Sequence, residues 1–434
     1  MAEVALSRGA RMADQHFHED QRPVIEFNHH SREYRDHWRE VSRDNLTRCP
    51  VAWTEEHGGF WLVSGYAPLT QAIRDDAAFS SYHDPTGDVN GYQGIMIPPF
   101  PRYPIPIELD PPEFFTYRRL LNPHFSPESS KNWEPYVRAT TADILDRVCA
   151  AGEMDLVLDL ANPVPASVTL KLLGLPLDDW AEFAATIHEM TYTTPGTAEF
   201  ARAATGMGRI TETVRRTVDE RRVEPADDLI SHLVRATVDG APVDDDRLHS
   251  MITLVLAGGV DTTTSLLANA LYWLHRHPRQ RQRLIDDPAL IPTAADEFLR
   301  YFAPVQMLAR TATRDVVLGG QEIRAGERVM LSFAAANQDP EVFSDPDTLD
   351  LARFPNRHVA FGAGIHRCLG AHLARVEFCV ILEEVLARIP DYQVDESAAK
   401  RYPSIAAANG YITMPATFTP SRPGRIPHPG KSEI

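Results

Sequence analysis

A long apolar segment in the second half of the chain sharply narrows the folds that are open to it. Residues 247–276 read as one helix, which ends before His277-Pro278. At 1.5 Å per residue this helix would be about 45 Å long, enough to cross a large domain. Its middle is apolar on nearly all sides, so we expect it to run through the centre of the protein with other elements packed around it.

Helical patterns dominate the chain from about Pro112 onward, and they outweigh a few short strand-like pieces. The other expected helices are residues 33–41, 142–148 and 166–173, and two helices within 178–222 that are interrupted around 193–196. The expected strands are residues 60–63, 316–318, 321–323 and 328–331. This balance predicts a mainly α protein.

The charge and the cysteine content of the 434-residue chain exclude several classes of protein. Acidic residues outnumber basic ones 60 to 43, for a net charge of −17. This argues against non-specific binding of nucleic acid, which requires a basic face. Cys49, Cys149, Cys368 and Cys379 are scattered and form no CxxC pair, so neither a disulfide framework nor a structural zinc site is favoured. Reduced cytosolic thiols are expected.

The ends of the chain and its most apolar stretch bear on domain limits and on membranes. Residues 1–22 are polar and lack the apolar core of a signal peptide. The best candidate for a membrane span, residues 251–260, is stopped by Asp261, well short of the roughly 20 residues that a span needs. We therefore expect a cytoplasmic protein with no membrane span. Its expected parts are a loose segment (1–25), one domain (26–419) and a loose tail (420–434).

One cysteine stands out by its surroundings. Cys368 follows the stretch Phe361-Gly362-Ala363-Gly364 and precedes Gly370 and a helical run. The two earlier glycines would let the backbone come close to a large flat partner, since they carry no side chain. The start of a helix favours the thiolate form of a nearby cysteine. These surroundings predict a cysteine that ligates iron, whereas Cys149 and Cys379 fit the alternative of buried apolar packing.

The middle of the central helix carries Gly258-Gly259, followed by Asp261 and Thr262. Each glycine costs roughly 1 kcal/mol relative to alanine in a helix, so its presence needs a reason. That reason is either close packing against another helix or a ligand pressed against the backbone. The Thr262 hydroxyl can bond the carbonyl of Gly258, four residues back, which bends a helix. A hydroxyl beside an acid in a widened groove suits a small molecule and a proton path.

Two further motifs are weak alone and gain weight from their order along the chain. Glu297 and Arg300 lie three residues apart, so on a helix they face the same side and can form a charge-assisted pair. Residues 110–113 (Asp-Pro-Pro-Glu) read as a helix start, and Arg118 follows. Taken singly, such side chains are more often solvated surface charges.

Together these motifs resemble those of the cytochrome P450 family of haem-thiolate monooxygenases, from about Cys49 to about Met414. The resemblance implies the cytochrome P450 fold, a large helical domain with a smaller β-rich N-terminal subdomain. It also implies haem b (iron protoporphyrin IX) as the cofactor, with Cys368 as the iron ligand. The other residues that it places at the haem are Arg118, Gly258, Gly259, Arg310, Phe361, Gly362, His366, Gly370 and Ala374. Of these, the two arginines and the histidine match the family's contacts to the propionates.

The same resemblance assigns the remaining motifs. Asp261 and Thr262 match the family's oxygen-activation motif, and they would steer protons during catalysis. The Glu297–Arg300 pair matches a structural Glu-x-x-Arg motif that Arg353 would complete. One position departs from the pattern, because many bacterial members have a histidine where this chain has Phe114. One propionate contact is therefore expected to be missing or replaced, with Tyr103 as a candidate.

The implied activity is insertion of one oxygen atom of O2 into a lipophilic small molecule, terpenoid, fatty acyl or steroid-like. Electrons would come from a ferredoxin and its reductase, docked near basic residues such as Arg119 and Arg367. The implied substrate-binding residues are Ile95, Met96, Leu254, Val255, Val305, Met307 and Ile405. Two alternatives are a peroxide-driven peroxygenase of the same fold, which would not need Asp261 and Thr262, and a non-catalytic haem-binding sensor.

Overall fold

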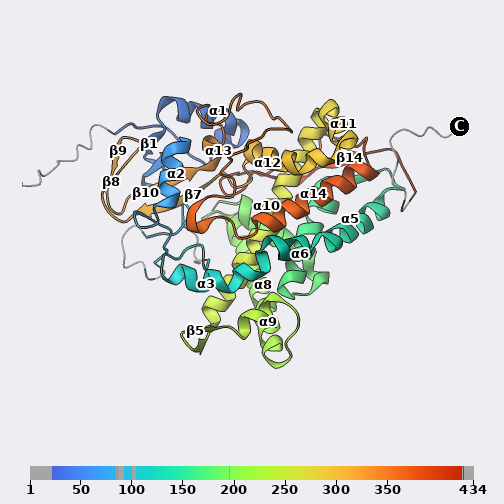
Figure 1. The fold of residues 1–434 in the computed structure, drawn as a ribbon, viewed down its shortest axis with the longest axis horizontal. Coiled ribbons are helices and arrows are strands. Elements are labelled where there is room, and N and C mark those ends of the chain that lie inside the picture. Colours follow the sequence, from blue (N-terminus) through green and yellow to red (C-terminus); the bar gives the residue numbers. More distant parts are fainter. Residues whose placement is uncertain are drawn as a thin grey trace, which may run out of the picture.

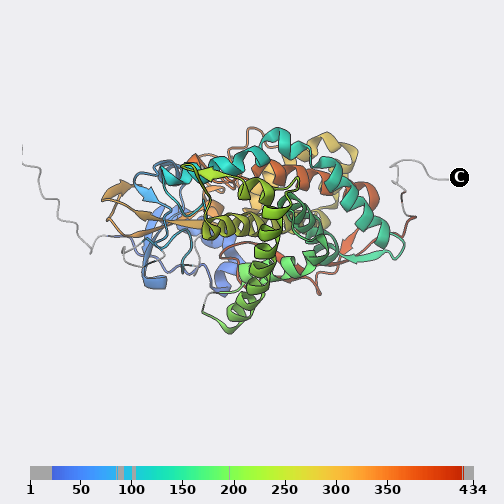
Figure 2. The ribbon, with the colours of Figure 1, turned by 90° about the horizontal axis from the view of Figure 1, so that it is seen from below.

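The main sheet lies at one end of the molecule, and helices make up most of the rest (Figures 1 and 2). This computed structural model describes residues 22–84, 86, 92–99, 104–194, 196–422 and 424. The predicted loose segment and tail lie largely outside the described residues. Helix α10 (Asp245–Arg276) lies between the other helices in the middle of the molecule, as its all-round apolar character predicts.

The helical predictions are confirmed. The other α-helices are α1 (Arg32–Arg48), α2 (Tyr66–Arg74), α3 (Glu113–Leu121), α4 (Pro127–Lys131), α5 (Glu134–Val148), α6 (Pro163–Leu173), α7 (Trp180–Tyr192), α8 (Ala198–Val223), α9 (Leu229–Val234), α11 (Pro278–Asp286), α12 (Ile291–Phe302), α13 (Phe333–Ala336) and α14 (Ala371–Arg388). The break predicted within 178–222 separates α7 from α8. Helix α6 ends at Gly174, whose φ of 85° is the left-handed conformation of a helix C-terminus.

The strands are short and form one main sheet with several small ones. They are β1 (Val51–Thr54), β2 (Phe60–Val63), β3 (Phe79–Ser80), β4 (Glu153–Asp155), β5 (Thr237–Val238), β6 (Ala241–Pro242), β7 (Met307–Ala312), β8 (Val316–Leu318), β9 (Gln321–Ile323), β10 (Arg328–Ser332), β11 (Gln393–Val394), β12 (Lys400–Arg401), β13 (Tyr411–Thr413) and β14 (Pro415–Thr417). All four predicted strands are present.

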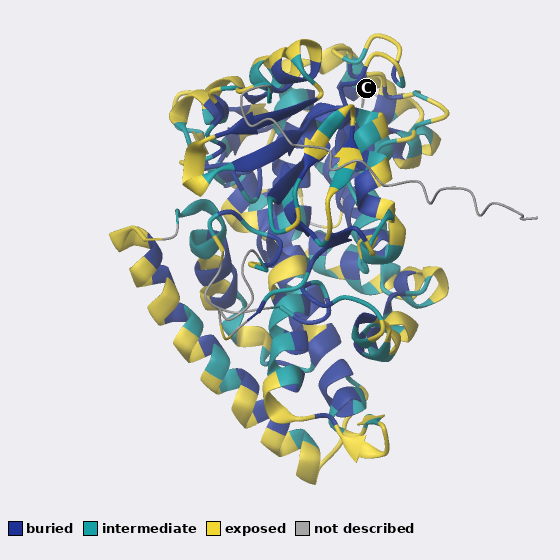
Figure 3. Ribbon diagram, turned by 90° about the vertical axis from the view of Figure 1, so that its left-hand side faces the viewer, coloured by how far each residue is buried: buried dark blue, intermediate teal, exposed yellow. Residues whose placement is uncertain are grey.

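The main sheet combines strands from residues 51–80 with strands from residues 307–332, in the order β1-β2-β10-β7-β3. Strand β10 runs parallel to β2, with Val329 opposite Trp61, and antiparallel to β7. Strands β2 and β10 are buried along their whole length, and Figure 3 shows the sheet in the colour of buried residues. The smaller β-rich part is therefore not built from N-terminal residues alone, because two of its strands come from the second half of the chain.

Helix α10 is capped and deeply packed. The side chain of Asp244 accepts a hydrogen bond from the backbone N–H of Arg247, which satisfies one of the open donors of the first turn. From Val260 to Leu271 every residue is buried except Thr262, which is partly exposed. One turn earlier, Gly258 is exposed although it lies near the middle of the helix. The helix therefore has an accessible strip within an otherwise buried length.

Two helical segments are long and apolar enough to cross a membrane by length and composition, Leu156–Leu173 and Asp245–Arg276. No such segment was expected from the sequence, because Asp261 interrupts the apolar run 251–260 of the second segment and Pro163 lies within the first. The windows are 78% and 61% buried inside the protein, respectively. Such burial is what the core helices of a packed domain show, and the segments form part of the main apolar core.

Candidate active site

The loop before α14 presents Cys368 on a defined backbone. The N–H of Cys368 donates to the carbonyl of Phe361 at 2.8 Å, and the N–H of Ala374 donates to the carbonyl of Gly370 at 2.9 Å. A Cβ built on Gly364, whose φ is 65°, would lie 2.5 Å from the carbonyl oxygen of Ile73 in α2. Gly364 is therefore required by its backbone conformation and by α2, and the approach of a flat partner to this loop stays a prediction.

Cys368 itself is accessible and yet surrounded by protein. Its side chain is exposed, while burial raises the pKa of its thiol above the usual value. A hydrogen bond from Gly370 and the charge of Arg118 act in the opposite direction and do not outweigh burial. Burial thus opposes the thiolate form that the helix start is predicted to favour. Both facts fit a sulfur that faces a space between elements of the fold.

Three cationic or polar side chains converge beside this loop. Arg118 of α3 donates to the carbonyl of Arg367 at 2.7 Å, which ties α3 to the cysteine loop. His366 lies close enough to Arg310 and Arg118 that both charges add to burial in lowering the pKa of its imidazole, to about 3. The structure thus brings together the three residues predicted to hold propionates.

Arg310 is a buried cation that lies near the carboxylates of Glu108 and Asp110 and forms no ion pair with them. It is 3% exposed on β7, and it donates to the carbonyl of Ala309 at 2.7 Å. Within the described part of the chain it forms no ion pair, and burial lowers its pKa to about 10. Nδ1 of His366 is likewise buried without a hydrogen-bond partner among the described residues. Buried groups of this kind are normally paired, so both fit the carboxylates of an anionic ligand.

Phe114 occupies the position at which the motif departs from the family pattern. It is buried, and its ring centroid lies 4.4 Å from that of His366. The side chain thus packs against a predicted propionate contact and offers no hydrogen bond of its own. Ser81 lies 3.2 Å from Nε2 of His366 and helps to fix the orientation of its ring. Tyr103, the predicted replacement, lies outside the described residues.

The two glycines of α10 are present for different structural reasons. A Cβ built on Gly259 would lie 2.4 Å from Oγ1 of Thr169, so this glycine allows α6 to pack closely. A Cβ built on Gly258 would meet nothing within 4 Å, so this glycine borders open space. The hydroxyl of Thr262 donates to the carbonyl of Gly258 at 3.1 Å, as predicted. Helix packing therefore accounts for Gly259, and the ligand alternative stays a prediction for Gly258.

Asp261 belongs to a buried cluster whose other members no local sequence motif predicts. It is 2% exposed, and its Oδ1 accepts a hydrogen bond from Tyr402 at 2.8 Å and lies within hydrogen-bond distance of Nδ1 of His188 in α7. Oδ2 of Asp261 is buried without a partner among the described residues. Burial and then the Asp261 charge raise the pKa of Tyr402 well above its usual value. Sequence reasoning missed His188 and Tyr402, because they approach Asp261 only through the fold.

Glu377 of α14 is a second buried acid that the sequence pattern did not indicate. It is 2% exposed, and burial raises the pKa of its carboxyl well above the usual value. A side-chain hydrogen bond with Thr263 of α10 opposes the shift and is too weak to reverse it. Burial thus favours the neutral form of Glu377, which lies beside Thr263, the residue that follows Thr262.

The predicted structural trio is assembled in the core below α14. Arg300 donates through Nε and Nη2 to the two carboxylate oxygens of Glu297, both at 2.8 Å. Arg353 donates through Nε to the same oxygens at 3.1 and 3.0 Å. Arg300 and Glu297 are fully buried. Further N–H groups of Arg300 donate to the carbonyls of Asn337, Pro346 and Thr348, so the pair is well satisfied and fixes the meander that carries Arg353.

The predicted substrate-binding residues fall into a packed and an accessible group. Met307 and Ile405 are 1% and 0% exposed and lie in one core cluster with Ala408. The partly exposed residues of the set are Met96, Leu254 and Val305, while Ile95 and Val255 are buried. Val305 forms an isolated bridge with Ala408, and the carbonyl of Ile95 accepts from the N–H of Ala309 at 2.7 Å. Through these two contacts, the segments of Ile95 and Ala408 lie beside β7 and the residues just before it.

These residues fit haem b on their chemistry. A large flat group needs room beside its iron ligand, and a Cβ on Gly370 would meet nothing within 4 Å, as on Gly258. Its carboxylates need cations, which Arg118 and the unpaired Arg310 provide. The accessible Cys368 is of the donor type that holds the iron in haem-thiolate proteins.

Comparisons with known proteins agree with this geometry. A profile of the family described as Cytochrome P450 matches residues 199–288 and 289–399. Cytochrome P450 130 of Mycobacterium tuberculosis is 37% identical over 342 residues, which make up 78% of this chain and 84% of that protein. Steroid C26-monooxygenase of Mycolicibacterium smegmatis is 34% identical over 379 residues, 85% of this chain and 90% of that protein.

The fold agrees as well. The crystal structure of CYP109E1 from Bacillus megaterium in complex with testosterone has a TM-score of 0.80 and 29% identity, and it covers 89% of this chain and 99% of that chain. The predicted fold class, with its smaller β-rich part, is thereby confirmed. The family binds haem b through a cysteine thiolate. The chain therefore belongs to the cytochrome P450 family and is a haem-dependent monooxygenase.

Proposed function

We propose that this monooxygenase hydroxylates a lipophilic small molecule, and that a steroid-like molecule is the first class to test, ahead of terpenoids and fatty acyl compounds. The observation that carries the proposal is the accessible strip of α10, at Gly258 and Thr262, within an otherwise buried helix. The residues placed around it by prediction, among them Leu254 and Val305, are apolar. The steroid C26-monooxygenase relative and the testosterone complex of a structural neighbour favour the steroid class.

In this proposal Cys368 ligates the haem iron, and Arg118, Arg310 and His366 hold the propionates. Haem bound in this way activates O2 and supplies the oxidising power for insertion of oxygen into a C–H bond. Arg310 is suited to its role because its burial leaves it in need of an anion. His366 would donate a hydrogen bond to a propionate from its buried Nδ1–H.

Thr262 and Asp261 handle protons in this proposal. The Thr262 hydroxyl donates its hydrogen bond to the carbonyl of Gly258. Its oxygen can therefore accept a hydrogen bond from water or from the substrate. Asp261 is held by Tyr402 and His188, so it can exchange a proton with this buried cluster without leaving its place. The pair therefore provides a positioned hydroxyl backed by a titratable cluster.

We also propose that the electrons come from an acidic ferredoxin that docks over the cysteine loop. Arg119 and Arg367 are exposed there, although the whole chain carries a net charge of −17. Charge complementarity speeds the encounter of such partners and makes it sensitive to salt. A cytoplasmic location and a single domain over 26–419 fit this assignment and stay predictions.

The test uses the purified haem-loaded protein and a panel of steroids, terpenoids and fatty acids. Binding of the right class displaces water from the iron, so we expect a saturable spectral shift with one class and none with the others. Turnover of that compound with NADPH, a ferredoxin and its reductase should then yield a product with one added oxygen atom. Product formed only with hydrogen peroxide would establish the peroxygenase alternative, and a shift without product under either condition would contradict the proposed reaction.

A further inference from the structure

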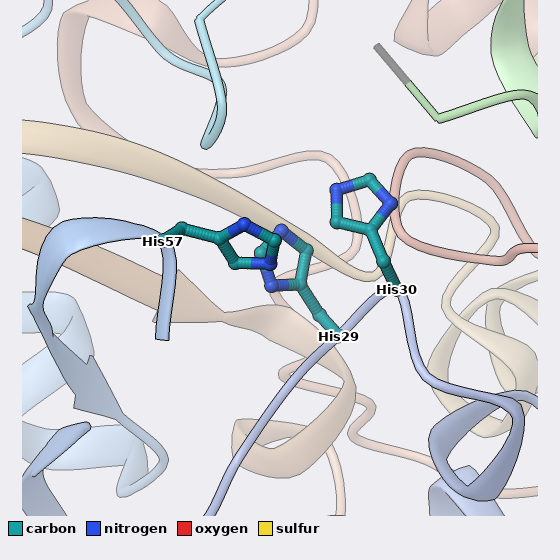
Figure 4. Close-up of side chains that lie close together, drawn as sticks. All are labelled: His29, His30 and His57. Atoms are coloured by element: carbon teal, nitrogen blue, oxygen red, sulfur yellow. The ribbon is translucent and has the colours of Figure 1, made fainter. Parts of the chain in front are cut away.

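Three histidines meet on the strand-rich side of the molecule, apart from the residues assigned to haem. His29 and His30 precede α1, and His57 lies in the turn between β1 and β2 (Figure 4). Their ring centroids are 4.4 Å apart for the adjacent pair, and His57 lies 5.2 and 5.3 Å from the other two. One ligand nitrogen of each ring lies within 4.8 Å of the other two. Two separate segments of the chain thus contribute to one cluster.

The buried member of the cluster has a bare nitrogen. His29 is 2% exposed, and its Nε2 lies 2.6 Å from the carbonyl oxygen of Ile97, to which it can only donate. Its Nδ1 therefore carries a lone pair, and this buried atom has no hydrogen-bond partner among the described residues. An imidazole that donates one N–H to a backbone carbonyl and leaves its other, buried nitrogen without a partner is suited to ligate a metal.

The other two rings are oriented by hydrogen bonds as well. Nε2 of His57 lies 3.2 Å from Oδ1 of Asn28, whose amide nitrogen donates to Glu56 at 3.0 Å. This chain of contacts holds the second nitrogen of His57 and connects it to a carboxylate, as outer partners of metal-bound histidines do. Nδ1 of His30 lies 3.4 Å from the hydroxyls of Thr194 and Ser404, and its Nε2 lies 3.3 Å from the carbonyl oxygen of Ile97, a contact that a metal bound to Nε2 would replace.

We propose that His29, His30 and His57 bind one divalent late transition metal ion, Zn²⁺ or Cu²⁺, with a fourth position open to water. Three neutral imidazoles are the donor set that these ions prefer, whereas Mg²⁺ and Ca²⁺ require oxygen ligands. Zinc–nitrogen bonds of about 2.0–2.1 Å place tetrahedral ligands roughly 3.3 Å apart, so the nitrogens have to close by at most about 1.5 Å. His57 is exposed on its turn, so this movement would fall mainly on its side chain.

The ion would join the segment before α1 to the β1–β2 turn, in addition to the hydrogen bonds that already connect the two. His57 belongs to the β1–β2 turn, Ile97 to the segment after Ile95 and Met96, and Thr194 to the connection between α7 and α8. A metal at the cluster would hold these segments together from one point. Because it binds the folded state, its presence should raise the unfolding temperature.

The experiment titrates ZnCl2 into haem-loaded protein that has been stripped of adventitious metal with a chelator and exchanged into fresh buffer. Calorimetry should show one zinc ion bound per chain, CuCl2 should bind more tightly, and MgCl2 should not bind. Zinc should also raise the unfolding temperature. Haem occupies Cys368, so that thiol does not compete in this preparation.

The variants are His57→Asn and His30→Asn, with His37→Asn on the exposed face of α1 as the control. Asparagine tolerates the left-handed backbone of residue 57, whose φ is 54°, so the turn is kept. Each cluster variant should weaken zinc binding at least tenfold and abolish the thermal shift, while the control should retain both. Absence of stoichiometric zinc binding, or equal binding by His57→Asn and the wild type, would overturn the site. The haem spectrum and the metal-free unfolding temperature report whether each variant is folded.

Discussion

Tyr402 donates a hydrogen bond of 2.8 Å to Asp261, across a separation of 141 residues in the chain. The contact fixes the acid of the oxygen-activation motif from outside the helix that carries it. His188 of α7 approaches the same carboxylate oxygen, so two elements hold one side chain. The position of Asp261 therefore depends on how α7 and the segment of Tyr402 pack against α10.

Replacement of Tyr402 by phenylalanine should impair the cluster without affecting haem. The change removes one of the two groups that hold Asp261, and the expected loss of stability is about 1 kcal/mol. We expect slower product formation, a larger solvent isotope effect and an unchanged haem spectrum. Tyr192→Phe is the control, because its ring lies 5.0 Å from that of Tyr402 and it has no described bond to Asp261. Equal effects of the two changes would argue against a positioning role for Tyr402.

Thr262→Ala should separate the consumption of electrons from the formation of product. The variant loses the hydroxyl that lies on the accessible strip of α10, and it should bind haem normally. Product per NADPH should fall roughly tenfold or more, with hydrogen peroxide released instead. Thr262→Ser retains the hydroxyl and should stay coupled. Full coupling in the alanine variant would remove Thr262 from proton delivery.

Cys368→Ala should abolish the spectrum of a thiolate-ligated haem after reduction and exposure to carbon monoxide. The prediction follows from the accessible side chain of Cys368 in its loop. Cys49→Ser is the control, since that thiol bonds the carbonyl of Val51 at 3.0 Å on the opposite part of the fold and should not affect the spectrum. A thiolate spectrum that survives in Cys368→Ala would require another ligand.

Glu297→Gln should destabilise the protein strongly. The carboxylate is fully buried and receives two arginines, so its neutralisation leaves Arg300 as an uncompensated buried charge. The expected cost is about 3–5 kcal/mol, measured as a shift of the urea midpoint together with loss of haem. Glu182→Gln breaks an exposed ion pair with Arg209 and should cost less than about 1 kcal/mol. Similar shifts for the two variants would contradict a structural role for the buried trio.

Glu377 should make the protein less stable as the pH rises. Burial raises the pKa of its carboxyl well above its usual value, so between that usual value and the raised one the folded state holds a proton that the unfolded state has lost. Its favourable contribution is complete below about pH 4 and declines above it. Glu377→Gln removes this dependence, so its urea midpoint should fall less than that of the wild type between pH 5 and pH 8. Parallel profiles would show that Glu377 is ionised in the folded state.

The parts of the fold that follow from local patterns could be predicted from the sequence. Helix α10 is apolar on nearly all sides over many turns, and few arrangements other than a central helix can bury such a segment. The pairing of β2 with β10 could not be predicted, because nothing in either strand specifies a partner across that separation. Apolar strands that are buried on both faces are interchangeable at the level of their sequence pattern.

The residues of the site also differ in whether local sequence patterns or only long-range packing specify them. Gly258, Thr262, Glu297 and Arg300 were identified because their spacing is set within one helix. His188 and Tyr402 carry no such signal, since only the packing of α7 against α10 brings them to Asp261. The thiolate role of Cys368 could be predicted from the glycines and the helix start, whereas the burial that opposes ionisation of its sulfur comes from parts of the fold that the local sequence does not reveal.

The parallel pairing of β2 with β10 has a consequence for synthesis of the protein. As the chain leaves the ribosome, Trp61 emerges long before Val329, so one edge of β2 waits without its partner until most of the chain has been made. An unpaired apolar edge is a site of association between chains. We expect incomplete chains that end before β10 to be retained by chaperones, and the yield of folded protein to depend on how quickly translation reaches Ser332.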